Sequence, residues 1–238
     1  NADKSRLYEA AGCAGKLAVF AVRLDTYAKN DAEKTFYEAA SDTAALGTLR
    51  RRILKDFQTL PVSAEYLHED VFDLSDVYGK DTMVMIDKLG TDRLPTFFAL
   101  KGSVDARLQN VPGLTHFTDK FMQFATRLWP NVVPKRMRAF RKAYPHHLIL
   151  KMRDGGIDEA RALLKEMTSN GALDFFECDD REAKMAGLLR FAAAGAAVRY
   201  MNVHSAEVED IIALDIALRR NDEDWFETLP KEVDDQLV

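Results

Sequence analysis

The chain has 238 residues, of which 47% are hydrophobic and 30% charged, with a formal net charge of −5, so it can bury a sizeable core in one or two lobes. No apolar run approaches the roughly 18 to 20 residues that span a bilayer, which excludes a transmembrane helix. Cys13 and Cys178 lie far apart and outside any CxxC or Cys/His cluster, so neither a disulfide framework nor a metal site is predicted.

The pattern in the first half of the chain predicts one strand followed by a strand–helix–strand unit. Residues 16–24, KLAVFAVRL, are rich in β-favouring residues and follow a glycine-punctuated turn. A second strand, TFYEA at 35–39, precedes the capping candidates Ser41 and Asp42. A helix then places Leu46, Leu49, Ile53 and Phe57 at helical spacing, and VSAEYLH at 62–68 predicts the next strand.

The same order returns later in the chain. HHLILKM at 146–152 predicts a strand, a turn follows at 154–156, and a helix carries Ile157, Ala160, Leu164 and Met167 on one stripe. LDFFEC at 173–178 predicts the closing strand. Two strand–helix–strand units of similar length predict an α+β fold, a ferredoxin-like lobe with an antiparallel sheet that carries helices on one face.

A basic segment lies between these two units. Residues 88–153 hold 13 Lys and Arg against three acids, a formal charge of +10, so the rest of the chain sums to −15. This segregation predicts one cationic face that contacts an anionic partner, either a lipid surface or nucleic acid. Its basic residues up to position 142 are Lys88, Arg93, Lys101, Arg107, Lys120, Arg127, Lys135, Arg136, Arg138, Arg141 and Lys142.

Two helices are predicted within this insert. The helix at 119–129 places Phe121, Phe124 and Leu128 on one face. After the break at 130–134, a second helix has Met137, Phe140 and Tyr144 on one side and the five basic residues between 135 and 142 on the other. A cationic face beside an aromatic face is typical of an interfacial membrane helix, although such apolar stripes also cover domain cores.

The last part of the chain is less regular. The small-residue run AAAGAA within 180–200 allows close approach of a helix or a ligand, while residues 211–222 fit either a strand or a buried helix. The tail to Val238 is acidic, and the sequence does not begin with Met, which we interpret as a fragment of a longer polypeptide.

Several of these segments, in order, resemble one family. RFAAAGAAVRY at 190–200, HSAEVEDIIALDIALRRNDEDWFETLP at 204–230 and the closing EVDDQLV are similar to the bacterial respiratory D-lactate dehydrogenases, which are FAD enzymes that reduce quinone. YEAAGCAGKLAVFAVRLDTY at 8–27, YGKDTMVMIDKLGTD at 78–92 and HHLILKM resemble the same family. The resemblance covers nearly the whole chain.

The resemblance implies an architecture and a reaction. Residues 1–25 would end an FAD-binding domain of the vanillyl-alcohol-oxidase type, 26–68 and 181–238 would form a cap lobe, and 69–180 would hold the membrane-binding insert with adjoining elements. FAD would take a hydride from D-lactate, giving pyruvate, and pass two electrons to a membrane quinone. The glycine-rich loops for the FAD pyrophosphate are expected upstream of residue 1, and backbone near Gly15 and Val19 would approach the cofactor.

The resemblance also directs the choice of substrate residues. A 2-hydroxy acid needs a cation for its carboxylate and a base near its hydroxyl. Arginine candidates in the matching segments are Arg190, Arg199, Arg219 and Arg220, and the base candidates are His147 and His204. Arg199 and His204 come first, because they lie beside the small-residue run.

The predicted function is the cap and membrane-binding region of a peripheral flavoenzyme on the cytoplasmic face of a bacterial inner membrane. Its expected partners are anionic phospholipid, quinone and D-lactate. The alternative is a non-catalytic module that binds a membrane surface or nucleic acid. No RNP, KH or zinc-finger pattern occurs, and the acidic remainder would repel a long polyanion, so no nucleic acid is expected.

Overall fold

The computed structural model describes residues 18–21, 30–108 and 110–211. Residues 1–30 and 31–238 form two separate compact units, and each is described by itself. In the first unit, residues 18–21 have no regular secondary structure, and Val19 and Phe20 are exposed. The strand predicted at 16–24 is therefore wrong for these four residues, because no described strand pairs with them to satisfy their backbone groups.

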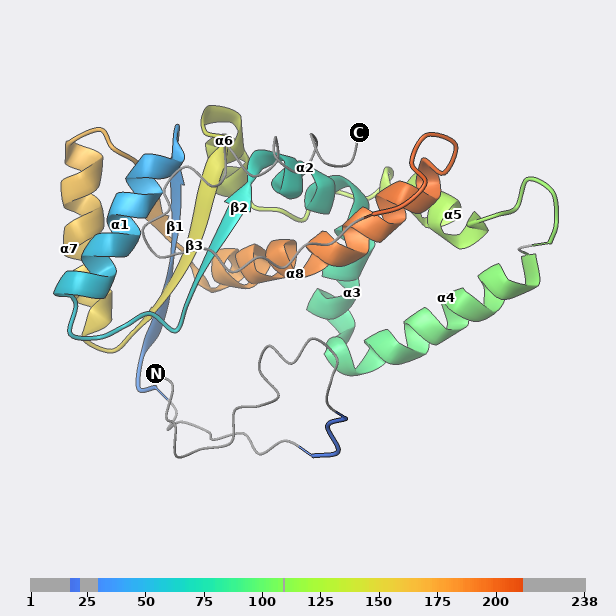
Figure 1. The fold of residues 1–238 in the computed structure, drawn as a ribbon, viewed down its shortest axis with the longest axis horizontal. Helices are drawn as coiled ribbons and strands as arrows, with labels where there is room; N and C mark the ends of the chain where they lie inside the picture. Colours follow the sequence, from blue (N-terminus) through green and yellow to red (C-terminus); the bar gives the residue numbers. More distant parts are fainter. Residues whose placement is uncertain (1–17, 22–29, 109, 212–238) are drawn as a thin grey trace. The chain divides into compact units, whose positions relative to one another are not determined.

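The described part of the second unit combines one sheet with eight α-helices (Figure 1). The strands are β1 (Glu33–Ala40), β2 (Ser63–His68), β3 (His146–Arg153) and β4 (Asp174–Glu177). The α-helices are α1 (Thr43–Asp56), α2 (Glu69–Tyr78), α3 (Lys80–Leu89), α4 (Leu94–Leu108), α5 (Phe117–Thr126), α6 (Lys135–Ala143), α7 (Gly156–Ser169) and α8 (Asp180–Val203). A 3₁₀ turn, η1 (Thr91–Arg93), joins α3 to α4.

The strand order is β2-β3-β1-β4, and all neighbouring strands are antiparallel. Phe36 of β1 pairs with Leu150 of β3 on one side and with Glu177 of β4 on the other. With α1 between β1 and β2, and α7 between β3 and β4, this is the split arrangement of a ferredoxin-like sheet. The predicted α+β class is confirmed, and α2 to α6 occupy the connection between β2 and β3.

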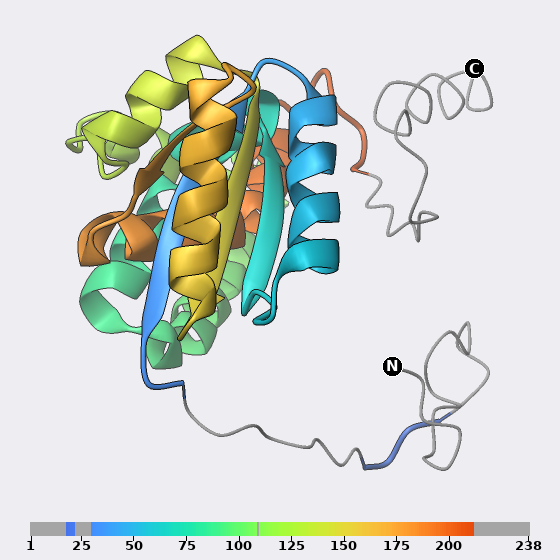
Figure 2. The same ribbon diagram turned by 90° about the vertical axis from the view of Figure 1, so that its left-hand side faces the viewer.

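Helices α1 and α7 cover one face of the sheet (Figure 2). Phe36 and Leu150 point to this face and belong to one apolar cluster with Leu49 of α1 and Leu164 of α7. The predicted cap residue Asp42 begins α1, since its side chain accepts a hydrogen bond from the backbone of Ala45.

The other face of the sheet is also covered, which differs from the expectation of helices on one face only. Tyr37, Ile149 and Phe176 form a second apolar cluster with residues of α2, α3, α6 and α8. β1 is the strand between β3 and β4, and its last six residues are all buried. Both faces carry large apolar side chains, so both need helices to remove them from water.

Helix α8 packs closely on α2, as the small-residue run predicts. It begins with a capping box between Asp179 and Glu182. A Cβ atom added at Gly79, which follows α2, would lie 2.8 Å from the Cβ of Ala192 and 3.5 Å from that of Ala196. Small side chains at these positions therefore let the two helices meet. Of the ambiguous segment 211–222, residues 212–222 lie outside the described residues.

Candidate functional site

Helix α5 buries its polar side and exposes its apolar side. Phe121 is 56% exposed, Phe124 64%, and Leu128, just past the helix, 80%. Asp119 and Gln123, on the opposite face, are buried. A helix that covers a core would be oriented the other way round. The helix expected at 119–129 is α5, which ends at Thr126, and its apolar stripe lies outside the core of the described residues.

A buried ion cluster holds the polar side of α5 inward. We use this name for Arg199 of α8, Asp81 of α3, Asp119 of α5 and Lys101 of α4. The Arg199 guanidinium pairs with both oxygens of Asp81, one of them at 2.7 Å, and donates to Asp119 Oδ1 at 3.1 Å. Lys101 Nζ lies 2.6 Å from the same Asp119 oxygen. Arg199 thus ties α8 to α3 and α5, and Lys101 adds α4 through Asp119.

The charges of this cluster stabilise one another. Burial alone would raise the pKa of Asp119, but hydrogen bonds from Lys101 and Asn202 hold it below the usual value. Burial alone would lower the pKa of Arg199, but its hydrogen bonds to Asp81 hold it above the usual value. Asp119 and Arg199 therefore stay ionised, and the orientation of α5 is fixed by charge as well as by packing.

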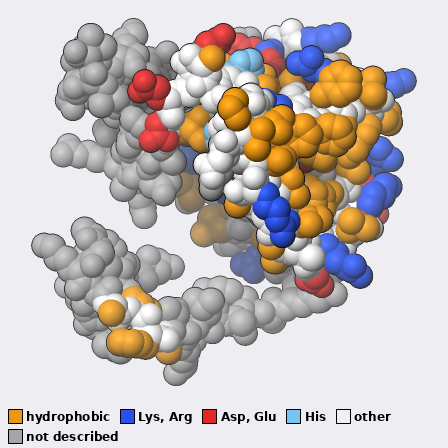
Figure 3. All heavy atoms as spheres, turned by 90° about the vertical axis from the view of Figure 1, so that its right-hand side faces the viewer, with side chains coloured by type: hydrophobic (Ala, Val, Ile, Leu, Met, Phe, Trp, Pro, Cys, Tyr) orange, Lys and Arg blue, Asp and Glu red, His pale blue; other side chains and the backbone are white. Residues whose placement is uncertain are grey.

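Helix α4 extends the exposed apolar surface. Leu94 is its single buried residue within the described chain, whereas Phe98 and Leu100 are exposed. Asp105 of α4 accepts hydrogen bonds from the backbone and hydroxyl of Thr118, which fastens α4 to α5. We call the combined surface the docking face, and Figure 3 shows apolar side chains gathered there with Lys and Arg around them. It comprises Phe98, Leu100, Phe117, Phe121, Phe124 and Leu128 with the exposed cations Arg93, Arg107, Lys120 and Arg127.

Helix α6 differs from the interfacial helix that its sequence predicts. Met137 is fully buried, and the ring of Phe140 lies 4.9 Å from that of Phe176, so the apolar side belongs to the core. The arginines on its other side are engaged within the protein, because α2 and the start of α8 are acidic. Arg136 pairs with Glu182, Arg138 with Asp76, and Arg141 with Asp73 and Glu69.

The predicted membrane-binding residues therefore fall into two groups. Lys88, Lys101, Arg136, Arg138 and Arg141 pair with acids. Six others are exposed and form no ion pair with another described residue: Arg93, Arg107, Lys120, Arg127, Lys135 and Lys142. Residues of the second group can contact an anionic partner without breaking an ion pair between described residues. Contact of any of the eleven with lipid stays a prediction.

The two histidine candidates lie in different surroundings. His147 is fully buried, and its ring centroid lies 5.6 Å from that of Tyr37 and 5.8 Å from that of Phe72. Burial, and secondarily the charge of Arg141, lower the pKa of His147 to about 4. His204 caps the end of α8, and its Nε2 lies 2.8 Å from the hydroxyl of Tyr78. His204 has solvent access and His147 does not, so the geometry favours a structural role for His147.

The arginine candidates are likewise separated. Arg199 is 5% exposed and belongs to the ion cluster, an arrangement that leaves it little room to bind a substrate carboxylate. Arg190 is exposed and pairs with Glu65. Arg219 and Arg220 lie outside the described residues.

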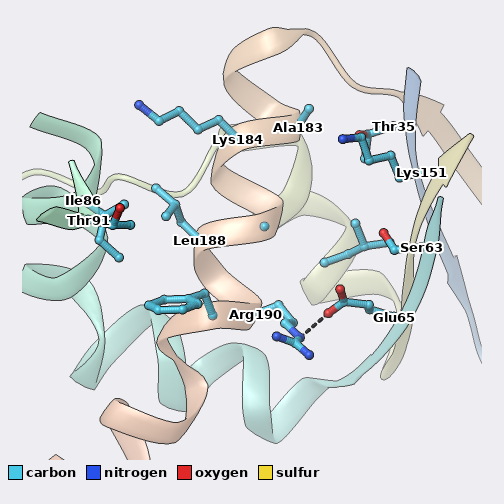
Figure 4. Close-up of a pocket in the computed structure, with 13 residues that line it drawn as sticks. Thr35, Ser63, Glu65, Ile86, Thr91, Lys151, Ala183, Lys184, Leu188 and Arg190 are labelled. Carbon is cyan, nitrogen blue, oxygen red and sulfur yellow. Dashed lines mark ion pairs between the residues drawn. The ribbon is translucent and has the colours of Figure 1, made fainter. Parts of the chain in front are cut away.

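Arg190 lines a pocket of about 480 Å³ between α8, the sheet and the end of α3 (Figure 4). Leu188 and Phe191 of α8 and Ile86 of α3 supply an apolar side. The polar lining residues are Thr35, Ser63, Glu65, Thr91, Lys151, Lys184 and Arg190. The pocket lies within the size range of small-molecule sites, roughly 300 to 1,000 Å³.

Gly15 and Val19 are the residues predicted to approach FAD. Gly15 lies outside the described residues, and Val19 is 53% exposed in a segment without secondary structure, so their contact with FAD stays a prediction. No cluster of potential metal ligands occurs among the described residues. Burial raises the pKa of the Cys178 thiol to about 12, so Cys178 is a buried apolar side chain rather than a reactive one. The described helices are all too short or too polar to cross a membrane.

Comparison with known proteins decides the family. The profile of the family described as "D-lactate dehydrogenase, membrane binding" matches residues 35–238. The chain belongs to this family. Proteins named quinone-dependent D-lactate dehydrogenase are 53% identical in Escherichia coli K12, 48% in Haemophilus influenzae and 37% in Corynebacterium glutamicum, each over this whole chain. The chain spans 42 to 43% of the length of these relatives.

The family assignment agrees with the docking face more directly than with α6. The sequence pattern indicates Phe121, Phe124 and Leu128 but does not indicate Phe98 or Leu100 of α4. Their run, LPTFFAL at 94–100, is apolar without a helical stripe, and this lack of a distinct polar side was the available signal. An exposed apolar surface of this kind is a common mark of a membrane or protein interaction site, which fits a membrane-binding family.

Proposed function

We propose that the chain is the cap and membrane-binding region of a quinone-dependent D-lactate dehydrogenase, and that it docks on lipid through α4 and α5. The whole enzyme would oxidise D-lactate to pyruvate and pass the electrons through FAD, held mainly by another part of the protein, to quinone. The single observation that carries the docking proposal is α5, whose phenylalanines are exposed while its aspartate and glutamine are buried.

The docking face combines two sources of affinity. Phe121, Phe124 and Leu128 would each contribute about 1 to 2 kcal/mol on entering lipid, after allowance for the area already buried. Each exposed cation adds about 1 kcal/mol near an anionic leaflet. Apolar contact and charge together exceed what either provides alone, which is the usual requirement for stable peripheral binding.

The cation content favours anionic phospholipid and hence the cytoplasmic leaflet of a bacterial inner membrane. We further propose that, within 69–180, helices α2 to α6 form the membrane-binding insert. The adjoining elements β3, α7 and β4 complete the cap lobe with β1, α1 and β2. Of the predicted substrate residues, His204 and Arg190 keep solvent access and remain proposals.

Co-sedimentation with vesicles tests docking. We expect binding to vesicles with anionic lipid to fall about a hundredfold or more when Phe121, Phe124 and Leu128 are changed to Ser. Lys120→Glu with Arg127→Glu should weaken binding strongly at low salt and less at high salt, because salt screens the attraction. Circular dichroism should be unchanged in both variants, since these side chains lie outside the core.

Matched controls come from α1 and α7. Leu54 is 58% exposed on α1, and Leu54→Ser should leave vesicle binding intact. Lys55→Glu with Lys165→Glu makes the same charge change as the α5 pair, away from the docking face. If the α5 variants sediment like the wild type, docking through this face is wrong.

The arginines of α6 do not provide such a test. Reversing Arg136, Arg138 and Arg141 would break ion pairs with α2 and α8, so the fold itself would be weakened. A parallel titration with duplex DNA addresses the nucleic-acid alternative. DNA binding with a steep salt slope and no lipid binding would favour that alternative.

A further inference from the structure

We propose that the pocket beside α8 binds the ring of the quinone, a neutral planar molecule with two carbonyl acceptors. This inference rests on the proposed function, because the quinone is known only from the names of the related proteins. The charge pairing and the lining residues of the pocket are the reasons for choosing this site.

The charges around the pocket cancel in pairs. Lys151 Nζ lies 2.5 Å from Glu33, Lys184 Nζ lies 2.6 Å from Asp87, and Arg190 pairs with Glu65. A substrate carboxylate would have to compete with an acid for each of these three cations. The local balance therefore favours a neutral ligand over an anion.

The remaining lining suits a ring with carbonyl groups. Leu188 of α8 reaches toward Ile86 of α3 (Figure 4). Phe191 of α8 adds an aromatic side chain to the lining. Thr35 and Ser63 on the sheet side carry hydroxyl groups, which can donate hydrogen bonds to carbonyl oxygens. An apolar slot with a few donors is the usual form of a site for a neutral aromatic ligand.

The pocket also adjoins the docking face. Thr91 of η1 lines the pocket, and Arg93 of the docking face follows two residues later, which places their Cα atoms within about 7 Å. The pocket therefore reaches the 3₁₀ turn that precedes α4, at the Arg93 end of the docking face.

Gly187 provides a specific way to fill the pocket. It lines the pocket in the middle of α8, and a Cβ added there meets no atom within 4 Å. Gly187→Leu places a side chain in the cavity and favours the helix, since glycine is a poor helix former. Gly195→Leu is the matched control, because Gly195 lies on the same helix, is equally unobstructed and does not line the pocket.

The probe is duroquinone, a fully substituted benzoquinone that has no ring position open to thiol addition. Titration of the 238-residue chain, followed by methyl NMR, should give saturable shifts at Ile86, Ile149 and Leu188. Gly187→Leu should weaken binding at least tenfold, and Gly195→Leu should bind like the wild type. Phe191→Ala removes one apolar side chain of the lining at a half-exposed position and should weaken duroquinone binding at least threefold. This variant replaces Gly187→Leu in the test if the Gly187→Leu protein fails to fold.

Three outcomes would overturn the proposal: no saturable shift with duroquinone, unchanged binding by the Gly187→Leu protein, or saturation of the same methyl groups by D-lactate but not by duroquinone. Vesicle co-sedimentation separates this failure from that of docking. If the wild-type protein binds vesicles but not duroquinone, only the pocket proposal is refuted. If it binds duroquinone but not vesicles, only the docking proposal is refuted.

Discussion

Replacement of Arg199 by Leu tests whether the buried ion cluster holds the insert together. Arg199 donates hydrogen bonds to both carboxylate oxygens of Asp81 and to one oxygen of Asp119. Asp81 and Asp119 are 0% and 1% exposed, so water cannot replace the lost guanidinium without opening the helices. The variant leaves one buried carboxylate unpaired and the other only partly paired.

The expected cost follows from what each aspartate keeps. Asp119 retains Lys101 at 2.6 Å and a hydrogen bond from Asn202 at 2.7 Å, whereas the hydrogen bonds of Asp81 to side chains all come from Arg199. Breaking a buried ion pair by removing one partner costs about 3 to 5 kcal/mol. Only Asp81 loses all of its side-chain partners. We therefore expect Arg199→Leu to lower the free energy of unfolding by about 3 kcal/mol, the lower end of this range.

Urea denaturation followed by circular dichroism measures this cost. Arg52→Leu is the control, since both members of its ion pair with Glu166 are exposed, and this variant should be destabilised far less than Arg199→Leu. The double variant Asp81→Leu/Arg199→Leu should recover much of the lost stability, because it removes the unpaired charge. A cost below about 1 kcal/mol for Arg199→Leu would refute the structural role and return Arg199 to the substrate candidates.

Two further predictions concern packing and pH. Gly79→Ala should cost about 1 to 3 kcal/mol, because its Cβ would lie 2.8 Å from that of Ala192, while Gly47→Ala in open helix should be neutral or stabilising; thermal melting compares them. The pKa of His147 is about 4 when folded and 6.5 in the unfolded chain, so stability falls as pH drops through that interval. From pH 7 to 5, His147→Phe should lose about 2 kcal/mol less than wild type in urea titrations, and equal losses would contradict this.

The strands and the two helices between them could be predicted from sequence because their signals are local. Phe36, Leu150 and Leu164 carry the periodicity of their own elements, and Asp42 marks a helix start that needs no distant partner. The repeat of one strand–helix–strand order then limited the sheet to a few topologies. Helices α2, α3 and α4 were not predicted, because each lacks a continuous apolar stripe of the length seen in α1 and α7.

The candidate site was predicted less well, for a physical reason. The charge excess between residues 88 and 153 marks the segment that holds α4, α5 and α6, but charge counts do not show which cation has an internal partner. Arg138 finds Asp76, 62 residues away in sequence, whereas Lys120 finds no acid among the described residues. Ion pairing of this kind depends on long-range placement.

The sequence by itself determined the α+β class, the basic insert and, through resemblance, the family. Only the tertiary structure decided which apolar stripe faces outward. Phe121 and Met137 lie on stripes of similar spacing, yet one is 56% exposed and the other fully buried. The difference arises because Asp119, on the opposite side of α5, pairs with a buried arginine 80 residues away. The hydrophobic periodicity shows that a helix has an apolar and a polar face. Which face is exposed depends on the partners that the polar side chains find in the folded protein.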